Sequence, residues 1–194
     1  MRIFGAEFSE YVGVCKTPFL IYLAWAVGLV FLSFVFFSAY SIINAFSLPA
    51  YMALGLYVGW GASKQRMGGF QSAIAGVIFG FGMGIVFGLT WGFMITQNTS
   101  ISAIFEPGIN ETIKSYGEPV TKQEILNFTA FWIVLLSPFF LAFAMAILSI
   151  VGSVAERYLG RKRTEEKFGE EKEQEEPTPV IRKKRPNKKF RKRK

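Results

Sequence analysis

The chain has 194 residues, a formal net charge of +8 at pH 7, and a composition that is 51% hydrophobic and 16% aromatic. It contains no His, no Asp and a single cysteine, Cys15. These counts exclude a disulfide within the chain, metal sites built from Cys and His, aspartic dyads, and nucleophile systems that need a histidine base. We therefore predict a protein that is not an enzyme and that has no metal, cofactor or catalytic site.

Three long segments contain no Asp, Glu, Lys or Arg: residues 17–63, 67–105 and 125–155. A helix needs only about 20 predominantly apolar residues to cross a bilayer, so these segments are too long to be ordinary core helices. The sequence predicts an all-α integral membrane protein with a transmembrane domain over residues 18–156. This domain is expected to be a four-helix bundle with spans at about 19–43, 48–63, 70–96 and 125–155.

Before the first span, residues 1–17 are predicted to form a short amphipathic helix on the cytoplasmic interface. Glu7 and Glu10 interrupt the apolar stretch that a signal peptide would require. Apolar residues recur at helical spacing between Ile3 and Cys15, which is typical of a helix lying on a membrane surface. A frayed terminus is the alternative. Cys15 is expected to be a buried thiol rather than a lipidated one.

The third predicted span carries a stripe of glycines at every fourth residue, and the second span repeats this spacing. Such small residues let helix backbones approach closely in a membrane. We expect packing inside the monomer, chiefly of the third span against the second. The alternatives are a seam between identical copies, a docking groove for another membrane protein, and a pore lining. The predicted packing residues are Gly55, Gly59, Gly76, Gly80, Gly84, Gly88 and Gly92.

Other polar groups in the predicted spans give little indication of transport. No ionisable side chain lies inside the predicted membrane interior, and proton relays and ion-coupled carriers normally require one. The hydroxyl groups of Ser33, Ser38, Thr90, Thr96 and Ser137 are expected to donate to the backbone of their own helices. An oligomeric channel or carrier is therefore the less favoured hypothesis.

An external loop is predicted over residues 97–124, between the third and fourth spans. Its Ile and Phe residues indicate that it lies on the outer membrane surface. Asn98 and Asn110 begin N-x-Ser/Thr sequons in this loop, and a third sequon begins at Asn127. We expect Asn110 to be the glycan acceptor, because Asn98 and Asn127 lie close to helix ends, and only in an organism that makes such glycans.

Residues 157–194 are predicted to be a disordered, charged cytoplasmic tail. An acidic stretch is followed by a C-terminal segment with ten cations, one aromatic ring and no acidic residue. We predict that this segment binds a polyanion. A ribosome or RNA is favoured over anionic lipid as the polyanion. The third hypothesis is that the basic segment folds back onto the acidic stretch of the same tail. The predicted contact residues are Arg182, Lys183, Lys184, Arg185, Lys188, Lys189, Phe190, Arg191, Lys192, Arg193 and Lys194.

The distribution of basic residues predicts the orientation. With both termini in the cytoplasm, 20 of the 22 Lys and Arg residues lie inside, and only Lys114 and Lys122 lie outside. Few Asn, Gln, Cys and His residues, together with a Lys/Glu-rich tail, are typical of thermophiles. These features and the sequons favour an archaeal plasma membrane over a eukaryotic endomembrane.

The leading functional hypothesis is an accessory or scaffold subunit of a membrane complex. Such a subunit would pack through its glycine-striped helices and tether an anionic cytoplasmic partner by its basic tail. Its partners would be membrane lipids, other membrane subunits or further copies of itself. The alternatives are an oligomeric small channel or carrier lined by glycine-rich helices, and a membrane enzyme of lipid or polyprenyl chemistry.

Overall fold

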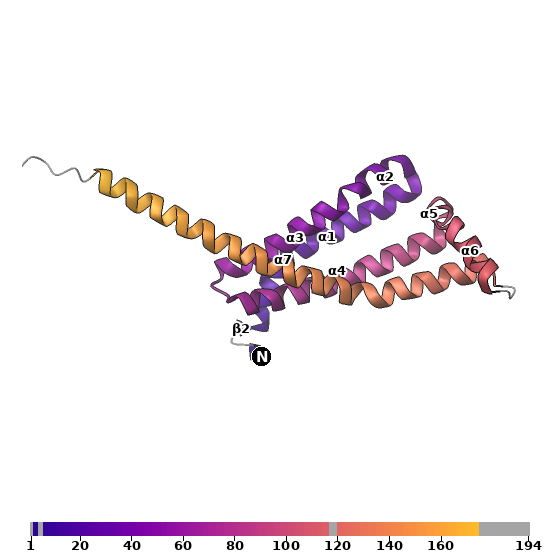
Figure 1. Ribbon diagram of the computed structural model, residues 1–194, viewed down its shortest axis with the longest axis horizontal. Coiled ribbons are helices and arrows are strands. Elements are labelled where there is room, and N and C mark those ends of the chain that lie inside the picture. The colour runs from indigo at the N-terminus through magenta and orange to yellow at the C-terminus, as the bar shows by residue number, and fades with distance from the viewer. Residues whose placement is uncertain (1, 4–5, 117–119, 175–194) are drawn as a thin grey trace, which may run out of the picture. The chain divides into compact units, whose positions relative to one another are not determined.

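The computed structural model describes residues 2–3, 6–116 and 120–174 and is almost entirely helical (Figure 1). The chain divides into two units, Met1–Tyr158 and Leu159–Lys194. Its elements, in chain order, are β1 (Arg2–Ile3), β2 (Ala6–Glu7), α1 (Phe8–Val35), α2 (Phe37–Ala45), α3 (Ser47–Lys64), α4 (Gly69–Gln97), α5 (Thr99–Ile104), α6 (Glu106–Tyr116) and α7 (Lys122–Gln174).

The N-terminal region differs from the predicted interfacial helix over residues 1–17. Arg2–Ile3 and Ala6–Glu7 pair as a short antiparallel hairpin, and α1 then runs without interruption into the first apolar segment. A capping box between Glu7 and Glu10 starts α1. The helix continues through Pro18 because one buried face extends along its whole length, so the boundary expected near residue 18 is absent. The buried residues of this face are Tyr11, Val14, Cys15, Pro18, Tyr22, Ala26, Leu29 and Ser33.

The first predicted span, residues 19–43, is divided between two helices. α1 ends at Val35, because the backbone of Phe36 (φ −138°, ψ 72°) leaves the helical region, and α2 follows. A second break at Phe46 separates α2 from α3, and these two helices are bent by 45° relative to each other. No Gly or Pro stands at Phe36, so the sequence contains no signal for the first break.

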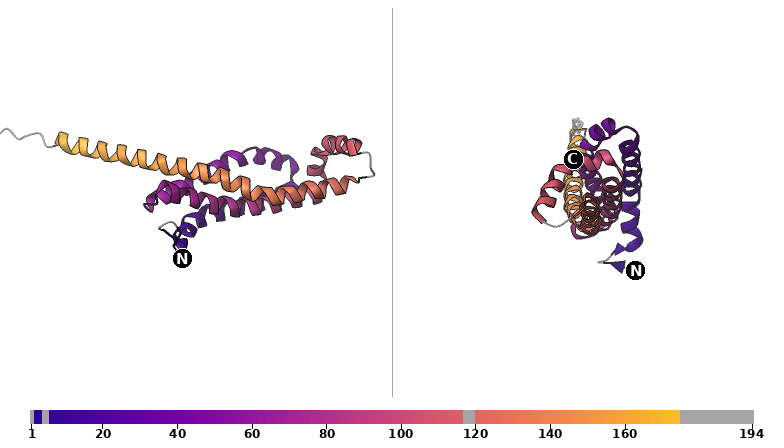
Figure 2. Two further views of the ribbon diagram at one scale, coloured as in Figure 1. Left: turned by 60° about the horizontal axis from the view of Figure 1, so that its bottom comes forward. Right: turned by 90° about the vertical axis from the view of Figure 1, so that its right-hand side faces the viewer.

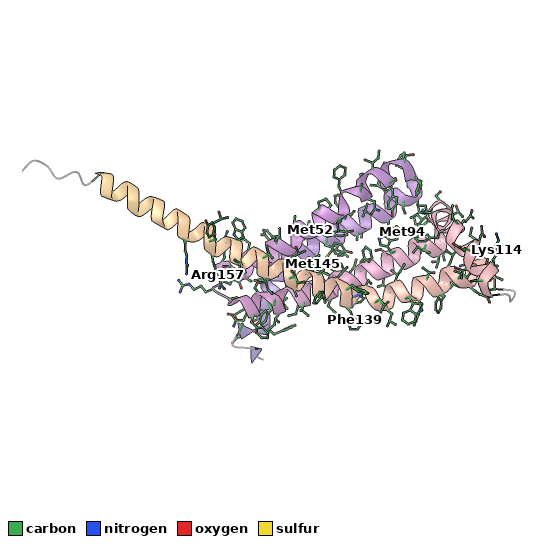
Figure 3. The ribbon with its side chains drawn as sticks, viewed as in Figure 1. Met52, Met94, Lys114, Phe139, Met145 and Arg157 are labelled. Carbon is green, nitrogen blue, oxygen red and sulfur yellow. The ribbon has the colours of Figure 1, made fainter. Side chains whose placement is uncertain are left out.

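The helices predicted at 48–63 and 70–96 lie close to where they were expected. α3 and α4 begin and end within about one residue of the predicted segments 48–63 and 70–96. Helices α1, α4 and α7 are each long and apolar enough to cross a membrane, and a fourth span results if the bent pair α2 and α3 counts as one. α7 also bends beside the labelled Phe139, next to Pro138 (Figure 3).

Helix α7 does not end where the predicted disordered tail begins. It continues from the apolar segment through Gln174, so residues 157–174 are helical. Glu, Lys and Arg have high helix propensity, and an existing helix extends without a new nucleation step. Residues 157–174 of the predicted tail are therefore helical, and the rest of the tail, residues 175–194, lies outside the described residues.

Large apolar side chains cover the outer faces of the long helices, as the sticks in Figure 3 show. In water, contiguous apolar surface of this kind marks an interaction or membrane site. The outward-facing residues include Val27 and Phe31 on α1, Phe81 and Leu89 on α4, and Phe139, Phe140 and Phe143 on α7.

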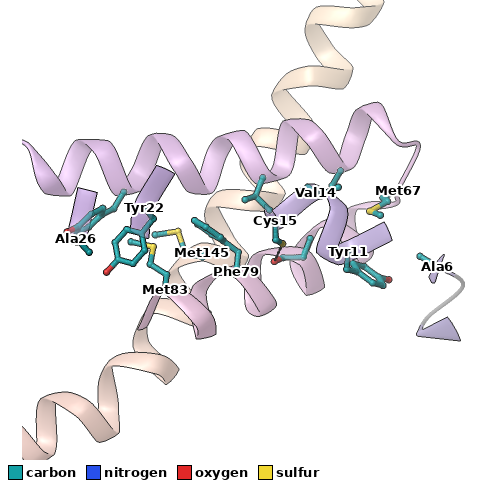
Figure 4. Close-up of a cluster of buried hydrophobic side chains, with 14 residues drawn as sticks. Ala6, Tyr11, Val14, Cys15, Tyr22, Ala26, Met67, Phe79, Met83 and Met145 are labelled. Carbon is teal, nitrogen blue, oxygen red and sulfur yellow. Dashed lines mark hydrogen bonds between the residues drawn. The ribbon is translucent and has the colours of Figure 1, made fainter. Parts of the chain in front are cut away.

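Helix α4 lies at the centre of the packing in the first unit. It packs against α1 and α3, and α7 runs alongside it in both orientations of Figures 1 and 2. One buried cluster joins α1, α3, α4 and α7, with Tyr22, Phe79, Met83 and Met145 close together (Figure 4). A second cluster joins the far ends of α1 and α4 to α5, α6 and the start of α7.

Candidate helix-packing site

The glycine stripe of α4 faces α7. The two helices run antiparallel, and each four-residue step back along α4 meets a four-residue step forward along α7. Gly92 lies against Ala130 and Val134, Gly88 against Val134 and Ser137, Gly84 against Ser137 and Pro138, Gly80 against Leu141 and Ala142, and Gly76 against Met145 and Ala146.

The distances leave no room for a side chain at the centre of this contact. A Cβ added at Gly80 would lie 2.7 Å from the Cα of Ala142, and one at Gly76 would lie 2.8 Å from the Cα of Ala146. Both are far inside van der Waals contact, so the backbones would have to separate. Close packing of this kind offsets the low helix propensity of glycine, which in water is about 1 kcal/mol worse than that of alanine.

The prediction that this stripe packs chiefly against the second span, α3, was wrong. The glycines of α4 meet α7, the fourth apolar segment, and not α3, although α4 contacts α3 elsewhere on its surface. Helix α3 uses its own small residues against α7 as well. A Cβ at Gly59 would lie 2.8 Å from the Cα of Ser149, and one at Gly55 would lie 2.7 Å from the sulfur of Met145. α7 therefore packs against both α3 and α4.

Sequence analysis missed the matching face on α7. A Cβ at Gly152 would lie 3.0 Å from the Cα of Leu56, so α7 contributes a glycine of its own to the contact with α3. The sequence pattern that indicates this face is a run of mostly small residues at every fourth position of α7. It is harder to recognise than the glycine stripe of α4, because Val and Pro interrupt it. This run consists of Ala130, Val134, Pro138, Ala142 and Ala146.

Hydrogen bonds between hydroxyls and backbone carbonyls reinforce the α4–α7 contact. Ser72 Oγ donates to the carbonyl oxygen of Ser149 (2.9 Å), and Ser149 Oγ donates to that of Ser72 (2.7 Å). Ser137 Oγ donates to the carbonyl oxygen of Gly84 at 2.7 Å, so its expected bond within its own helix is replaced by one between helices. Ser33, Thr90 and Thr96 do bond to their own helices, as predicted.

Two polar contacts hold α7 at the end of the unit where α3 and α4 are connected. Ser63 Oγ donates to a carboxylate oxygen of Glu156 at 3.0 Å, and Arg157 donates to the carbonyl oxygen of Met67 at 2.7 Å. Among the described residues, no group of three His, Cys, Asp or Glu side chains is placed to hold a metal ion. The polar groups at these helix contacts therefore join one helix to another.

Cys15 is buried against α4, where its Sγ donates to the carbonyl oxygen of Ala75 at 3.3 Å. Figure 4 shows it inside the cluster of apolar side chains. A lipid chain on this sulfur would have to displace that packing. The prediction of a buried thiol is confirmed.

The two candidate glycan acceptors differ sharply in their surroundings. Asn98 is 6% exposed. Its amide nitrogen donates to the carbonyl oxygen of Ser33 at 2.8 Å, and its Oδ1 caps α5 by accepting from the N–H groups of Ser100 and Ile101. Asn98 is therefore a link between α1, α4 and α5. Asn110 is exposed on α6, so it remains the predicted acceptor.

Replacing Asn98 with Ala is expected to destabilise the fold by about 2 kcal/mol or more, because a helix cap and a buried hydrogen bond are lost together. Asn110→Ala is the matched control, since an exposed side chain away from such contacts typically changes stability by no more than about 0.5 kcal/mol. Thermal unfolding in detergent, followed by tryptophan fluorescence, measures both variants. Equal melting temperatures would contradict the role assigned to Asn98.

The predicted polyanion contacts, from Arg182 to Lys194, lie outside the described residues. Comparison of this chain with protein-family models, with curated protein sequences and with solved structures gave no match, so its function is argued from its own residues and contacts.

Proposed function

We propose that this chain is a small multi-pass membrane protein without catalytic activity that serves as an accessory or scaffold subunit of a membrane complex. Support for a membrane location comes from α1, α4 and α7, which are long and apolar enough to span a bilayer, and from their apolar outer faces. With the bent pair α2 and α3 as one span, the chain crosses four times as a four-helix bundle.

The observation that carries this proposal is the occupied glycine stripe. α7 covers the small residues of α4 within the same chain, and hydrogen bonds join the two helices at Ser72–Ser149 and at Gly84–Ser137. A stripe filled in this way serves to build a compact membrane unit. It is not free to line a lumen or to form a seam between copies, so no observation favours the alternative of a glycine-lined channel.

The orientation we propose places both termini in the cytoplasm. Lys114 and Arg157 lie toward opposite ends of the first unit (Figure 3). The end with Arg157 also holds Lys64 and Arg66, whereas the described residues at the other end carry only Lys114 and Lys122 as cations. By the positive-inside rule the end with Arg157 faces the cytoplasm.

The tail is proposed to be the part that recruits a partner. Residues 159–174 are helical and would span about 24 Å at 1.5 Å per residue. The ten cations of the C-terminal segment come after this helix in the chain. A basic segment separated from the last span by a helix is suited to a polyanion away from the bilayer surface, and a ribosome or RNA has that chemistry.

A crosslinked pull-down from native membranes tests the scaffold function, using the full chain and a variant that lacks residues 180–194. Both forms should recover the same membrane subunits, because those contacts belong to the first unit. Only the full chain should recover ribosomal or RNA-containing partners. Recovery of the tagged chain alone in both cases would overturn the proposal.

A further inference from the structure

The turn that connects α1 to α3 has a surface unlike that of an aqueous loop. We call residues 36–48 the hairpin tip: it comprises α2 and the two breaks at Phe36 and Phe46. No Asp, Glu, Lys or Arg occurs anywhere from Thr17 to Ser63, so the whole hairpin, tip included, is uncharged. A turn that emerged into water would normally carry polar or charged residues.

Four of the exposed side chains of the tip are large and apolar. Phe36 is 61% exposed, Ile42 66%, Phe46 62% and Leu48 68%. All four therefore leave most of their surface outside the protein, and they fall within 13 consecutive residues. Exposed apolar surface in one place marks a site that another apolar medium covers.

Two of the polar side chains of the tip, Tyr40 and Ser47, are buried. Ser47 is buried and its Oγ accepts a hydrogen bond from the indole Nε1 of Trp25 at 3.2 Å. The Tyr40 side chain is also buried, among the residues that join α1 to α5 and α6. The exposed hydroxyls of Ser38 and Ser41 are small groups that suit the level of lipid headgroups. The tip therefore carries polar side chains but no charged one.

The lengths of the two arms limit how far the tip reaches. The uncharged part of α1, from Thr17 to Val35, is about 28 Å long and α3 is about 27 Å long at a rise of 1.5 Å per residue. The hydrocarbon core of a bilayer is about 30 Å thick. Arms of this length end at the outer boundary of the hydrocarbon and do not carry the tip beyond it.

We propose that the hairpin tip is seated in the outer leaflet, at the boundary between acyl chains and headgroups, with lipid as its partner. Phe36, Phe46 and Leu48 then contact acyl chains, and α2, which is bent by 45° relative to α3, forms the outer end of the fourth span at the interface. This inference rests on the membrane location given under Proposed function. It adds that, among the described residues, α5, α6 and the start of α7 are the parts exposed to water on the outer side.

Cysteine accessibility tests whether the tip is shielded from water. Cys15→Ser removes the only thiol of the chain, and the serine hydroxyl can replace the Sγ–H that donates to the carbonyl oxygen of Ala75. Single cysteines are then placed at Phe46, Leu48, Ser115 and Gln65. In sealed cells, a membrane-impermeant maleimide should label Ser115→Cys from outside, and Phe46→Cys and Leu48→Cys at least tenfold more slowly. Labelling of Phe46→Cys at the rate of Ser115→Cys would overturn the proposal.

Lipid quenching shows what covers the tip. The purified Phe46→Cys protein is labelled with an environment-sensitive fluorophore and reconstituted, at low density, in phosphatidylcholine vesicles whose acyl chains carry nitroxide groups. We expect strong quenching at Phe46 and little at Ser115. A tip that is protected but not quenched is covered by protein, which overturns lipid as the occupant.

The same set of variants separates failure of this inference from failure of the membrane topology. Ser115→Cys should react only from outside and Gln65→Cys only from inside. If both react from the same side, the four-span arrangement is wrong. The quenching at Phe46 still decides, independently, whether lipid contacts the tip.

Discussion

Replacing Gly84 with Leu is expected to destabilise the membrane unit by about 3 kcal/mol or more, the upper range for overpacking. A Cβ at this position would already lie 2.7 Å from the backbone nitrogen of Pro138, and the rest of a leucine side chain has no space. Separating the helices would also break the hydrogen bond from Ser137 Oγ to the carbonyl oxygen of Gly84. At about 2–4 °C per kcal/mol, the melting temperature should fall by roughly 6 °C or more.

Two other glycines provide controls for this variant. A Cβ at Gly28 on α1 meets no atom within 4 Å, so Gly28→Ala should leave stability unchanged or raise it slightly. A Cβ at Gly82 lies 3.1 Å from the edge of the Phe19 ring, and a small movement of that side chain can accommodate alanine. Gly84→Leu melting at the temperature of the unsubstituted protein would show that the α4–α7 contact is not formed.

Removing residues 180–194 is expected to abolish binding to RNA while leaving the membrane unit folded. The deleted segment holds ten cations and no acidic residue. A protein that contacts 6–10 phosphates loses roughly 10³–10⁵ in affinity between 50 and 200 mM salt, because each neutralised phosphate releases a counterion. Co-sedimentation of the detergent-solubilised protein with RNA or ribosomes, at several salt concentrations, measures the loss of binding on truncation and the salt dependence of binding.

The same assay, carried out with RNA and with anionic liposomes, distinguishes the three hypotheses for the tail: binding to RNA or ribosomes, binding to anionic lipid, and folding back onto the acidic stretch. Phe190→Ala should weaken RNA binding by about 1–3 kcal/mol if the ring stacks on an exposed base, whereas a purely ionic contact would not respond. Binding to anionic liposomes without RNA binding would assign the segment to lipid. If neither polyanion binds at about 0.15 M salt, the acidic stretch neutralises the segment, and a tether function is contradicted.

The amino-acid sequence by itself determined the features that depend on local composition. The C-terminal end of α3 and the start of α4 follow from Lys64 and Arg66 between two long apolar runs, and these positions were predicted to within about one residue. Burial of Cys15 and the bonding of Thr90 and Thr96 to their own helices were also predictable, because an apolar surrounding leaves such groups few partners.

Only the tertiary structure decided which surfaces meet. The glycine spacing on α4 showed that some backbone comes close, but it is equally compatible with α3, α7 or a second copy. The choice of α7 depends on a matching face about 50 residues further along the chain, with Ser137 and Ser149 placed to donate across the contact. The break at Phe36 and the burial of Asn98 are likewise set by neighbours distant in sequence, since a local pattern carries no information about contacts between separate helices.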